Sequence, residues 1–326
     1  MNYVFGSGSS YINYKEESTY GQRWSNNVIS TTCLIRPGSM PSKSQQQIHP
    51  TYLRGNPYDQ YGSIRTKSTV EGSYNFYISN SSIELLKECN QKLVDNKFEL
   101  QTPIKSFNIL HPLGSTNKSQ LHFTGMKPSQ INVSIPGDNS LAEGSISFLG
   151  QDLLNDDLNL STTGDNDQTE ANVQALSDGF FEGWSSHVKT HTQTYISVYD
   201  FSLNINNNLT APDTLNNKYV ISEPIEGLRE VTGTFTIVLQ PDDLTSGHLF
   251  DIFDKDSDSD SAFSMNIQMI STKNQILDIV MPKVIIEQGS TPTDISTDYL
   301  RYNLTFRALY DVSTKRDVVF RDYTPS

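Results

Sequence analysis

Four acidic residues stand at alternate positions in the run DKDSDSD, and their spacing is that of oxygen ligands for calcium. They occupy ligand positions one, three, five and seven of a calcium-binding loop: Asp254, Asp256, Asp258 and Asp260. The sixth position is Ser259 instead of glycine, and the twelfth is Met265 instead of glutamate. Since the sharp turn and the bidentate ligand are both missing, the run favours a solvated acidic turn over a calcium site.

Two histidines, His187 and His191, lie four residues apart, a spacing that would place them on one face of a helix. The threonines around them favour an extended chain instead, which would splay the two rings, and no cysteine or carboxylate completes a zinc site. The sequence also lacks nucleophile-elbow, metalloprotease and phosphate-loop motifs. We therefore predict a protein that is not an enzyme and that needs no metal or cofactor.

The composition of the 326-residue chain suits strands and polar loops better than long helices. Hydrophobic residues make up 35% and charged residues 19%. The length allows two average domains or one large all-β unit, and either could bury a sizeable core. No stretch is long and apolar enough for a membrane span, and the N-terminus does not resemble a signal peptide. We expect Cys33 and Cys89 to be buried thiols, since a bridge needs an oxidising compartment.

The net charge of −13 is unevenly distributed along the chain. The segment 1–127 carries +5, the segment 128–188 has ten acids and no base, and the segment 189–326 carries −8. Nucleic-acid binding requires lysine and arginine to displace counterions from phosphates. This charge distribution therefore excludes a protein that binds DNA tightly. An acidic wall would repel phosphates weakly, by about 0.4 kcal/mol for two charges ~10 Å apart in water.

The clearest element is a half-buried strand at 234–240, followed by Pro241 and a predicted short helix. Apolar and polar residues alternate along it, so one face is predicted to meet the core and the other water or a partner. An earlier stretch, 72–82, aligns with 233–243 without a gap. The matching apolar residues are predicted to be the core of the assembly strands: Tyr74, Phe76 and Ile78 in the first copy, and Phe235, Ile237 and Leu239 in the second. This match predicts an internal duplication.

The rest of the chain reads as short antiparallel strands around one helix. Ser81 and Glu84 form a capping-box signature that opens a helix ending near Asn90. Alternation and turn residues predict further strands at these ranges: 63–79, 106–110, 121–124, 131–135, 145–149, 192–205, 219–221, 263–270, 277–281, 283–287 and 301–310.

The expected organisation has five parts. Residues 1–62 lack a sustained period but are rich in aromatics, which predicts an extended arm that orders against a neighbouring subunit. An acidic insertion or loop is predicted within 151–190. The ranges in order are 1–62 for the arm, 63–150 for the first half of the β-domain, 151–190 for the insertion, 191–315 for the second half and 316–326 for a tail.

The order of these elements resembles the major tail tube proteins of long-tailed bacteriophages over residues 60–315. The resemblance is carried by GLREVTGTFTIVLQPDDL, MPKV and RYNLTFRALYD in the second half, and by VEGSYNFYIS and INVSIPGDNSLAEGSISFL in the first. It implies an all-β, antiparallel sandwich or barrel-like fold related to the ring-forming tube proteins of contractile injection machines.

The same resemblance implies a structural function in the virion. Copies would close into homohexameric rings assembled in the host cytoplasm, and stacked rings would form the conduit through which genomic DNA leaves. Expected partners are the chain itself, the tape measure protein, and tail terminator and baseplate proteins. Two alternatives stay open on the sequence: a virion adhesin or carbohydrate-binding β-sandwich, and another tail or neck ring protein of related fold.

Overall fold

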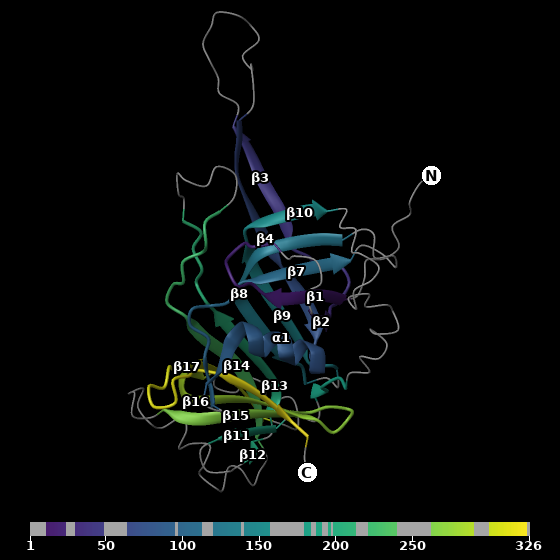
Figure 1. Cartoon of the computed structure of the whole chain (residues 1–326). Helices are drawn as coiled ribbons and strands as arrows, with labels where there is room; N and C mark the ends of the chain where they lie inside the picture. The colour runs from purple at the N-terminus through teal and green to yellow at the C-terminus, as the bar shows by residue number, and fades with distance from the viewer. Residues whose placement is uncertain are drawn as a thin grey trace, which may run out of the picture.

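The computed structural model describes a mainly antiparallel β-protein with one helix (Figure 1). The described residues are 11–23, 30–48, 64–94, 97–112, 120–137, 140–156, 179–183, 187–190, 195–196, 198–212, 221–239, 262–289 and 300–324. The elements are β1 (Tyr11–Glu16), β2 (Thr31–Leu34), β3 (Ser42–Ile48), β4 (Ile64–Tyr77), α1 (Asn80–Asn90), β5 (Gln91–Val94), β6 (Lys97–Leu100), β7 (Phe107–Pro112), β8 (Gln120–Ile135), β9 (Glu143–Gly150), β10 (Asp152–Asp156), β11 (His187–Thr190), β12 (Tyr195–Ile196), β13 (Val198–Asn206), β14 (Glu230–Leu239), β15 (Phe263–Ile270), β16 (Ile276–Gly289), β17 (Leu300–Ala308) and β18 (Val319–Tyr323).

Sixteen strands join one branched sheet, and β5 and β6 form a separate hairpin. The sheet branches at β8, whose first half pairs with β7 and β10 and whose second half pairs with β9 and β13, and at β16, which pairs with β15, β17 and β18. The prediction of an antiparallel all-β fold is thus confirmed. The described strands do not close into a barrel within one chain.

Gly125 allows β8 to turn from one layer into the next. Its φ of +66° is a left-handed conformation that favours glycine. A side chain there would overlap Tyr20 and Gln151, which pack against the bend. The carboxylate of Glu17 accepts hydrogen bonds from the Gly125 N–H at 2.7 Å, the Gly21 N–H at 2.8 Å and the Ser106 hydroxyl at 2.7 Å. Burial nevertheless raises the pKa of Glu17 above its ordinary value.

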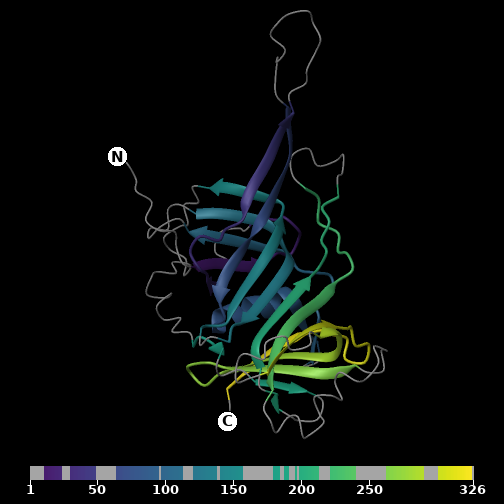
Figure 2. The same ribbon diagram turned by 180° about the vertical axis from the view of Figure 1, so that it is seen from behind.

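We define the central sheet as β3, β4, β9, residues 127–135 of β8, β13, β14, β17 and residues 284–289 of β16, which pair in that order. These strands lie side by side across the middle of Figure 2. Alternation puts their apolar side chains on one face, within the hydrophobic core, including Phe76, Phe148, Phe201, Phe235 and Phe306. The opposite face is polar.

Two pairs of predicted short strands are each one long strand in the structure. The pieces 121–124 and 131–135 are the two halves of β8, and the pieces 277–281 and 283–287 both lie in β16. Each strand is irregular between its two predicted pieces, with register shifts near Gly125, Pro128 and Pro282. The predicted strand at 219–221 is absent at Ile221, and residues 219–220 lie outside the described part.

The helix ends at Asn90 as predicted, but it begins with different capping residues. The N-cap is Ser79, whose N–H donates to Ser82 Oγ at 2.8 Å, while Ile83 N–H donates to the Ser79 carbonyl at 2.9 Å. Glu84 instead forms an ion pair with Lys87, with 2.9 Å between Glu84 Oε1 and Lys87 Nζ. A serine at the third helical position therefore fills the role that the prediction gave to Glu84. The helix predicted after Pro241 lies outside the described residues.

Much of the predicted arm is integral to the body of the chain. β1 pairs with β2 and β7, and the side chains of Ile12, Tyr14 and Cys33 are fully buried. The strand Tyr11–Glu16 is stabilised by tertiary packing and not by its short alternation of apolar and polar residues. β3 then pairs with the first part of β4, and the two project as a hairpin at the top of Figure 1.

The predicted acidic loop begins with a strand. β10 pairs with the first half of β8, so residues 152–156 belong to the sheet, whereas residues 157–178 lie outside the described part. Both cysteines are buried free thiols, as predicted. No helix in the part of the chain that the structure describes is long and apolar enough to cross a membrane.

Candidate assembly site

The predicted duplication extends over nearly all strands of the sheet. Seven antiparallel pairings in the first half have a counterpart in the second. They are β1·β2 and β11·β12, β1·β7 and β11·β15, β3·β4 and β13·β14, β4·β9 and β14·β17, β7·β8 and β15·β16, β8·β9 and β16·β17, and β8·β10 and β16·β18. We call β1–β10 the first repeat and β11–β18 the second. Strand pairing thus makes each repeat longer than the predicted halves, 63–150 and 191–315.

The register of the pairings also repeats. Tyr74 faces Ile146 on β9 and Phe235 faces Leu304 on β17, with Gly72 and Gly233 two residues earlier in each case. The irregularities coincide too: β8 shifts register against β7 and again against β9, and β16 does the same against β15 and β17. The structural equivalence therefore reproduces the gap-free sequence match over 72–78 and 233–239, and residues 240–243 lie outside the described part.

The shared glycine permits close approach of the neighbouring backbone in both repeats. A side chain at Gly72 would overlap the backbone of Pro41, and one at Gly233 would overlap the Ser202 carbonyl and the Phe306 ring. In addition, Gly72 has a φ of +150°, which side-chain-bearing residues rarely adopt. The same residue type thus serves the same packing need twice.

The side chains predicted as the assembly core lie inside the chain. Tyr74, Phe76, Phe235 and Ile237 belong to β4 and β14 and are buried, and Ile78 is buried just after β4. Leu239 ends β14, and its side chain lies outside the described residues. The described side chains of this set are therefore part of the core of each repeat and are not available to contact another copy.

One strand pairing, β8·β13, joins the central strands of the two repeats. Residues 130–135 of β8 pair with Asn206 to Phe201 of β13 in antiparallel register. Across this junction, Asn204 Nδ2 donates to Asn132 Oδ1 at 2.5 Å. β13 also pairs with β14, so both of its edges are occupied.

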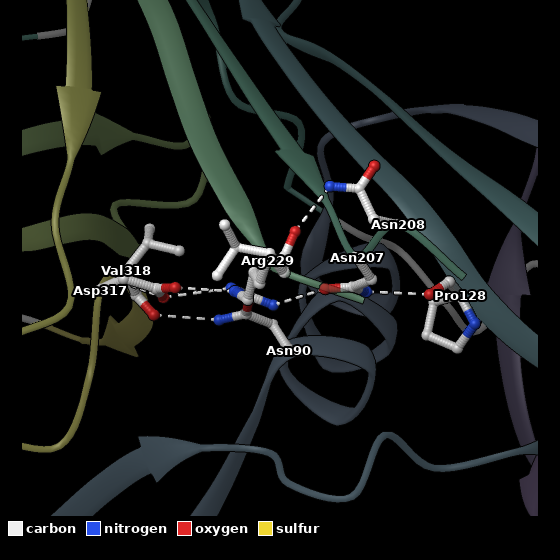
Figure 3. Close-up of polar contacts among 8 residues, drawn as sticks. Asn90, Pro128, Asn207, Asn208, Arg229, Asp317 and Val318 are labelled. Atoms are coloured by element: carbon white, nitrogen blue, oxygen red, sulfur yellow. Dashed lines mark hydrogen bonds and ion pairs between the residues drawn. The ribbon is translucent and has the colours of Figure 1, made fainter. Parts of the chain in front are cut away.

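A buried cluster around Arg229 fastens the same junction (Figure 3). The guanidinium donates to both carboxylate oxygens of Asp317, at 2.7 and 3.1 Å, to Asn207 Oδ1 at 3.0 Å and to Asn90 Oδ1 at 2.5 Å. The amide groups continue the network: Asn207 donates to the Pro128 carbonyl at 2.9 Å and Asn90 to the Val318 carbonyl at 3.0 Å.

The Arg229 cluster connects α1 and β8 of the first repeat with three segments of the second. The side chains of Arg229 and Asp317 are only 14% and 7% exposed, so the ion pair is largely desolvated and its hydrogen bonds have to be complete. No sequence pattern indicates this cluster, because its members are far apart in the chain and share no characteristic spacing.

Other contacts also cross between the repeats, two of them beside the Arg229 cluster. Lys127 of β8 is buried and lies 2.7 Å from Glu223, in the segment that precedes β14. Gln91, which follows Asn90, donates to the Phe320 carbonyl at 2.7 Å and accepts from the Phe320 N–H at 2.8 Å. The C-terminal strand β18 is therefore anchored to the end of α1.

Of the residues weighed as metal ligands, the structure describes only His187. His187 lies at the start of β11, consistent with an extended chain, whereas His191 and the run from Asp254 to Asp260 lie outside the described residues. No group of three or more potential ligands is present among the residues that are described. Calcium binding by the aspartate run stays an untested and disfavoured possibility of the sequence.

Comparison with known proteins identifies the duplicated sheet. Residues 8–308 match the model of a family described as phage tail tube protein. The chain belongs to the phage tail tube protein family. A search of curated proteins found no match.

The family match covers β1 through β17 and so includes both repeats of this phage tail tube protein. The predicted family is confirmed, and membership supports a structural, non-enzymatic role as a component of the phage tail. β18, which closes the second repeat, follows the matched range.

Proposed function

We propose that copies of this tail tube protein join edge to edge into rings, and that stacked rings form the conduit through which the phage genome leaves the virion. The observation that carries the proposal is the β8·β13 junction, where two equivalent repeats already form one continuous sheet. A second copy can extend the sheet in the same way, since exposed strand edges pair readily with another strand.

The first edge available for this contact is on β16. In the first repeat, β13 pairs with the edge of β8 beyond the end of β7. The corresponding edge of β16 begins at Gln288, the equivalent of Gln130, and its described residues are 288 and 289. It lies beyond the end of β15, and β17 occupies the opposite edge. No strand among the described residues pairs with residues 288 and 289 on the β15 side.

The second edge is on β3, which corresponds to β13. Within the described part of the chain, β3 pairs only with β4. Its residues from Ser42 to Gln45 are exposed, and Met40 just before it is 42% exposed despite its apolar side chain. Among the described strands, β3 therefore pairs along one edge only.

The two free edges suit a head-to-tail ring. β3 lies toward the top of Figure 1 and β16 toward the bottom, so one copy can offer β16 to the β3 of the next. Such a heterologous contact gives a closed ring when its rotation returns to the start, and a helical filament when it does not.

The repeats make the predicted ring size testable. The resemblance to tail tube proteins implies six members, and each chain supplies two equivalent repeats. If the member is the chain, a ring holds six copies of 36.6 kDa; if the member is the repeat, it holds three. Mass measurement of single rings distinguishes these two arrangements.

Electron microscopy of the purified full-length chain tests the proposal directly. We expect rings or hollow cylinders, whereas globular particles of one chain at high concentration would contradict it. A monomer retained on a glycan array would instead favour an adhesin, and a single ring per virion would favour a neck or terminator protein.

A cysteine pair tests the edge contact separately. Gln130 faces Asn206 at the internal junction, and the equivalent positions between copies are Gln288 and Ser44. The variant Gln288→Cys with Ser44→Cys should form disulfide-linked ladders on oxidation, because paired strands bring Cα atoms within bonding range. Gln288→Cys with Lys15→Cys is the control and should not. Tubes without ladders would reject the edge assignment and leave tube formation intact.

The remaining expectations are parts of the same proposal. They place the protein in the virion tail after assembly in the host cytoplasm, where it meets the tape measure, terminator and baseplate proteins. Co-purification of these proteins with tails, and not with the isolated chain, would support this order of contacts.

A further inference from the structure

The strand β3 carries a lysine at a position that is apolar in the second repeat. Lys43 pairs with Val70 on β4, and Ile205 of β13 pairs with Val231 on β14. The two valines are equivalent, because each lies two residues before the shared glycine, and both are buried in the core. Residues that pair across two strands lie on the same face of a sheet. Lys43 is therefore a charged residue on the core-facing side of β3, where β13 has an isoleucine.

The β8·β13 junction shows what lies opposite this position. Ile205 faces Ile131 of β8, and both side chains are fully buried. The residue before Ile131 is Gln130, whose equivalent in β16 is Gln288. The residue after Gln288 is Gly289, which is therefore the equivalent of Ile131.

The two seams thus differ in the pair that meets on the core-facing side. Within the chain, the pair is Ile205 and Ile131. Between two copies joined in the same register, the pair is Lys43 of one copy and Gly289 of the next. A residue without a side chain leaves room for the long stem of a lysine, so a charged residue on one edge is matched by a gap on the other.

Asp152 holds the ammonium group of Lys43 within the same chain. Lys43 Nζ donates to Asp152 Oδ1 at 2.5 Å, and the same oxygen accepts from the Leu153 N–H at 2.9 Å. Asp152 begins β10, which lies next to β3 in Figure 1. The side chains of Lys43 and Asp152 are 32% and 23% exposed in the single chain, so a strand that joins the β3 edge would cover them further.

From these contacts we infer that Lys43 determines which strand edge β3 accepts, and that this edge is the β16 edge of a second copy, with Gly289 opposite Lys43. The inference rests on the proposed function, which supplies the contact between the two edges. It adds the residue that gives this contact its partner and its register.

A large apolar residue opposite Lys43 would be incompatible with this arrangement. Such a residue would either displace the ammonium group from Asp152 or bury it among apolar atoms, and a buried cation without its partner is costly. Inward-pointing charges are one means by which edge strands avoid unwanted pairing. Lys43 therefore opposes every edge and register that places a large side chain against it, and it admits the one that places glycine there.

This difference between the seams follows from how each of them forms. The internal junction joins two repeats of one chain, so the connection between the repeats restricts the partner. A seam between separate chains lacks that connection, and discrimination has to come from the edges themselves. A lysine on β3 and an isoleucine on β13 fit these two situations.

Exchange of one pair for the other tests the inference. Gly289→Ile places an isoleucine opposite Lys43. It should raise the protein concentration needed for tube formation by about tenfold or more, because a polar group is covered without its partner. Gly289→Ile with Lys43→Ile recreates the isoleucine pair of the internal junction and should recover most of this loss. Gly289→Ile with Lys15→Ile, at an exposed lysine of β1, is the matched control and should not recover it.

Sedimentation and electron microscopy over a concentration series measure these effects. Tubes from Gly289→Ile at the parent's concentration would overturn the inference. Equal recovery by Lys15→Ile, or no recovery by Lys43→Ile, would also overturn it, and tube formation by the parent chain would still stand. Failure of the parent chain to form tubes would instead overturn the proposed function.

A charge exchange decides the matter if Gly289→Ile lowers the denaturation midpoint of the free chain. Lys43→Glu places a carboxylate beside Asp152 and should prevent tube formation, with little change in that midpoint because a partly exposed ion pair contributes little to stability. Lys43→Glu with Asp152→Lys restores an ion pair and should restore tubes. Parent-like tubes from Lys43→Glu alone would overturn the inference, and so would a failure of the exchanged pair to assemble.

Discussion

The two repeats share their strands and register but differ at their edges. In the second repeat, β13 lies between β14 and β8, with both edges paired. In the first repeat, the equivalent β3 pairs only with β4 among the described strands and extends into a projecting hairpin. Both repeats thus have the same strand framework. The edge of β13 forms the internal junction, whereas the equivalent edge of β3 is not paired with any described strand. The comparison shows that a repeat can keep its fold while its edge strand is paired differently.

The Arg229 cluster is specific to the junction between the repeats, and its loss should have the largest effect. Arg229→Ala leaves the Asp317 carboxylate buried without its cation, which typically costs about 3–5 kcal/mol of unfolding free energy. Arg307→Ala, at a more exposed ion pair, should cost about 0–1 kcal/mol. Denaturant unfolding of the two variants measures the difference.

A double variant sharpens this result. Arg229→Ala combined with Asp317→Ala should destabilise less than the sum of the single changes, since neither buried charge is then left alone. Simple additivity would show that the two side chains act independently, contrary to the geometry in Figure 3.

The equivalent glycines should respond alike to substitution. Gly233→Ala and Gly72→Ala each push a side chain into neighbouring backbone, and overpacking of this kind costs about 1–3 kcal/mol. Gly72→Ala adds backbone strain at its positive φ and should be the more damaging. Ser73→Ala, on the polar face, should stay within about 0.5 kcal/mol. Thermal or denaturant midpoints measure these changes, and a tolerated Gly233→Ala would contradict the close packing of β13 on β14.

Tyr74 and Phe235 occupy the same position, but the tyrosine hydroxyl is buried without a hydrogen-bond partner in the described part of the chain. Burial raises the pKa of Tyr74, so the hydroxyl stays protonated. The substitution Tyr74→Phe makes this position the same in both repeats. It should raise the free energy of unfolding by up to about 1 kcal/mol, because an unsatisfied polar group is removed. The reverse change, Phe235→Tyr, should destabilise. If Tyr74→Phe lowers the denaturation midpoint, the hydroxyl has a partner after all.

His111 gives the first repeat a pH dependence that the second lacks. Its ring stacks on Tyr74, and burial lowers its pKa below the ordinary value of 6.5. The unfolded chain then binds a proton that the folded chain resists, so stability from this group should fall as the pH drops below about 6.5. The matching position on β15 is Ile267.

His111→Ile should therefore flatten the acid side of the stability curve between about pH 6.5 and 5, with little change at neutral pH. Unfolding midpoints measured over this range check the effect, which we expect to be the smallest of the four. An equal acid response in the variant would assign the pH dependence to other groups.

Local sequence patterns predicted the elements whose alternation of apolar and polar residues matches their burial in the structure. The alternation around Phe235 and Tyr74 gave the correct strand type, and their gap-free match gave the duplication. By contrast, β8 was predicted as two short strands, 121–124 and 131–135, because alternation is interrupted where the continuous strand bends at Gly125 and shifts register after Pro128. β1 was missed because six residues carry too little period and owe their burial to β7.

The candidate site was less accessible to sequence than the fold. Pairing partners of a strand edge depend on which strands the topology leaves open, and no local pattern encodes this for β3 or β16. The Arg229 cluster joins residues 90, 207, 229 and 317, so only the folded chain reveals it. The assembly residues predicted from alternation are core residues, and the strand edges carry the proposed contacts.

The β8·β13 pairing bears on how a ring could nucleate. In a ring of this design, half of the lateral seams form by intramolecular folding, at an effective concentration that does not fall on dilution. Only the other half needs encounters between chains. Assembly would then start from chains in which two repeats are already joined, so fewer encounters between chains are needed to close the first ring.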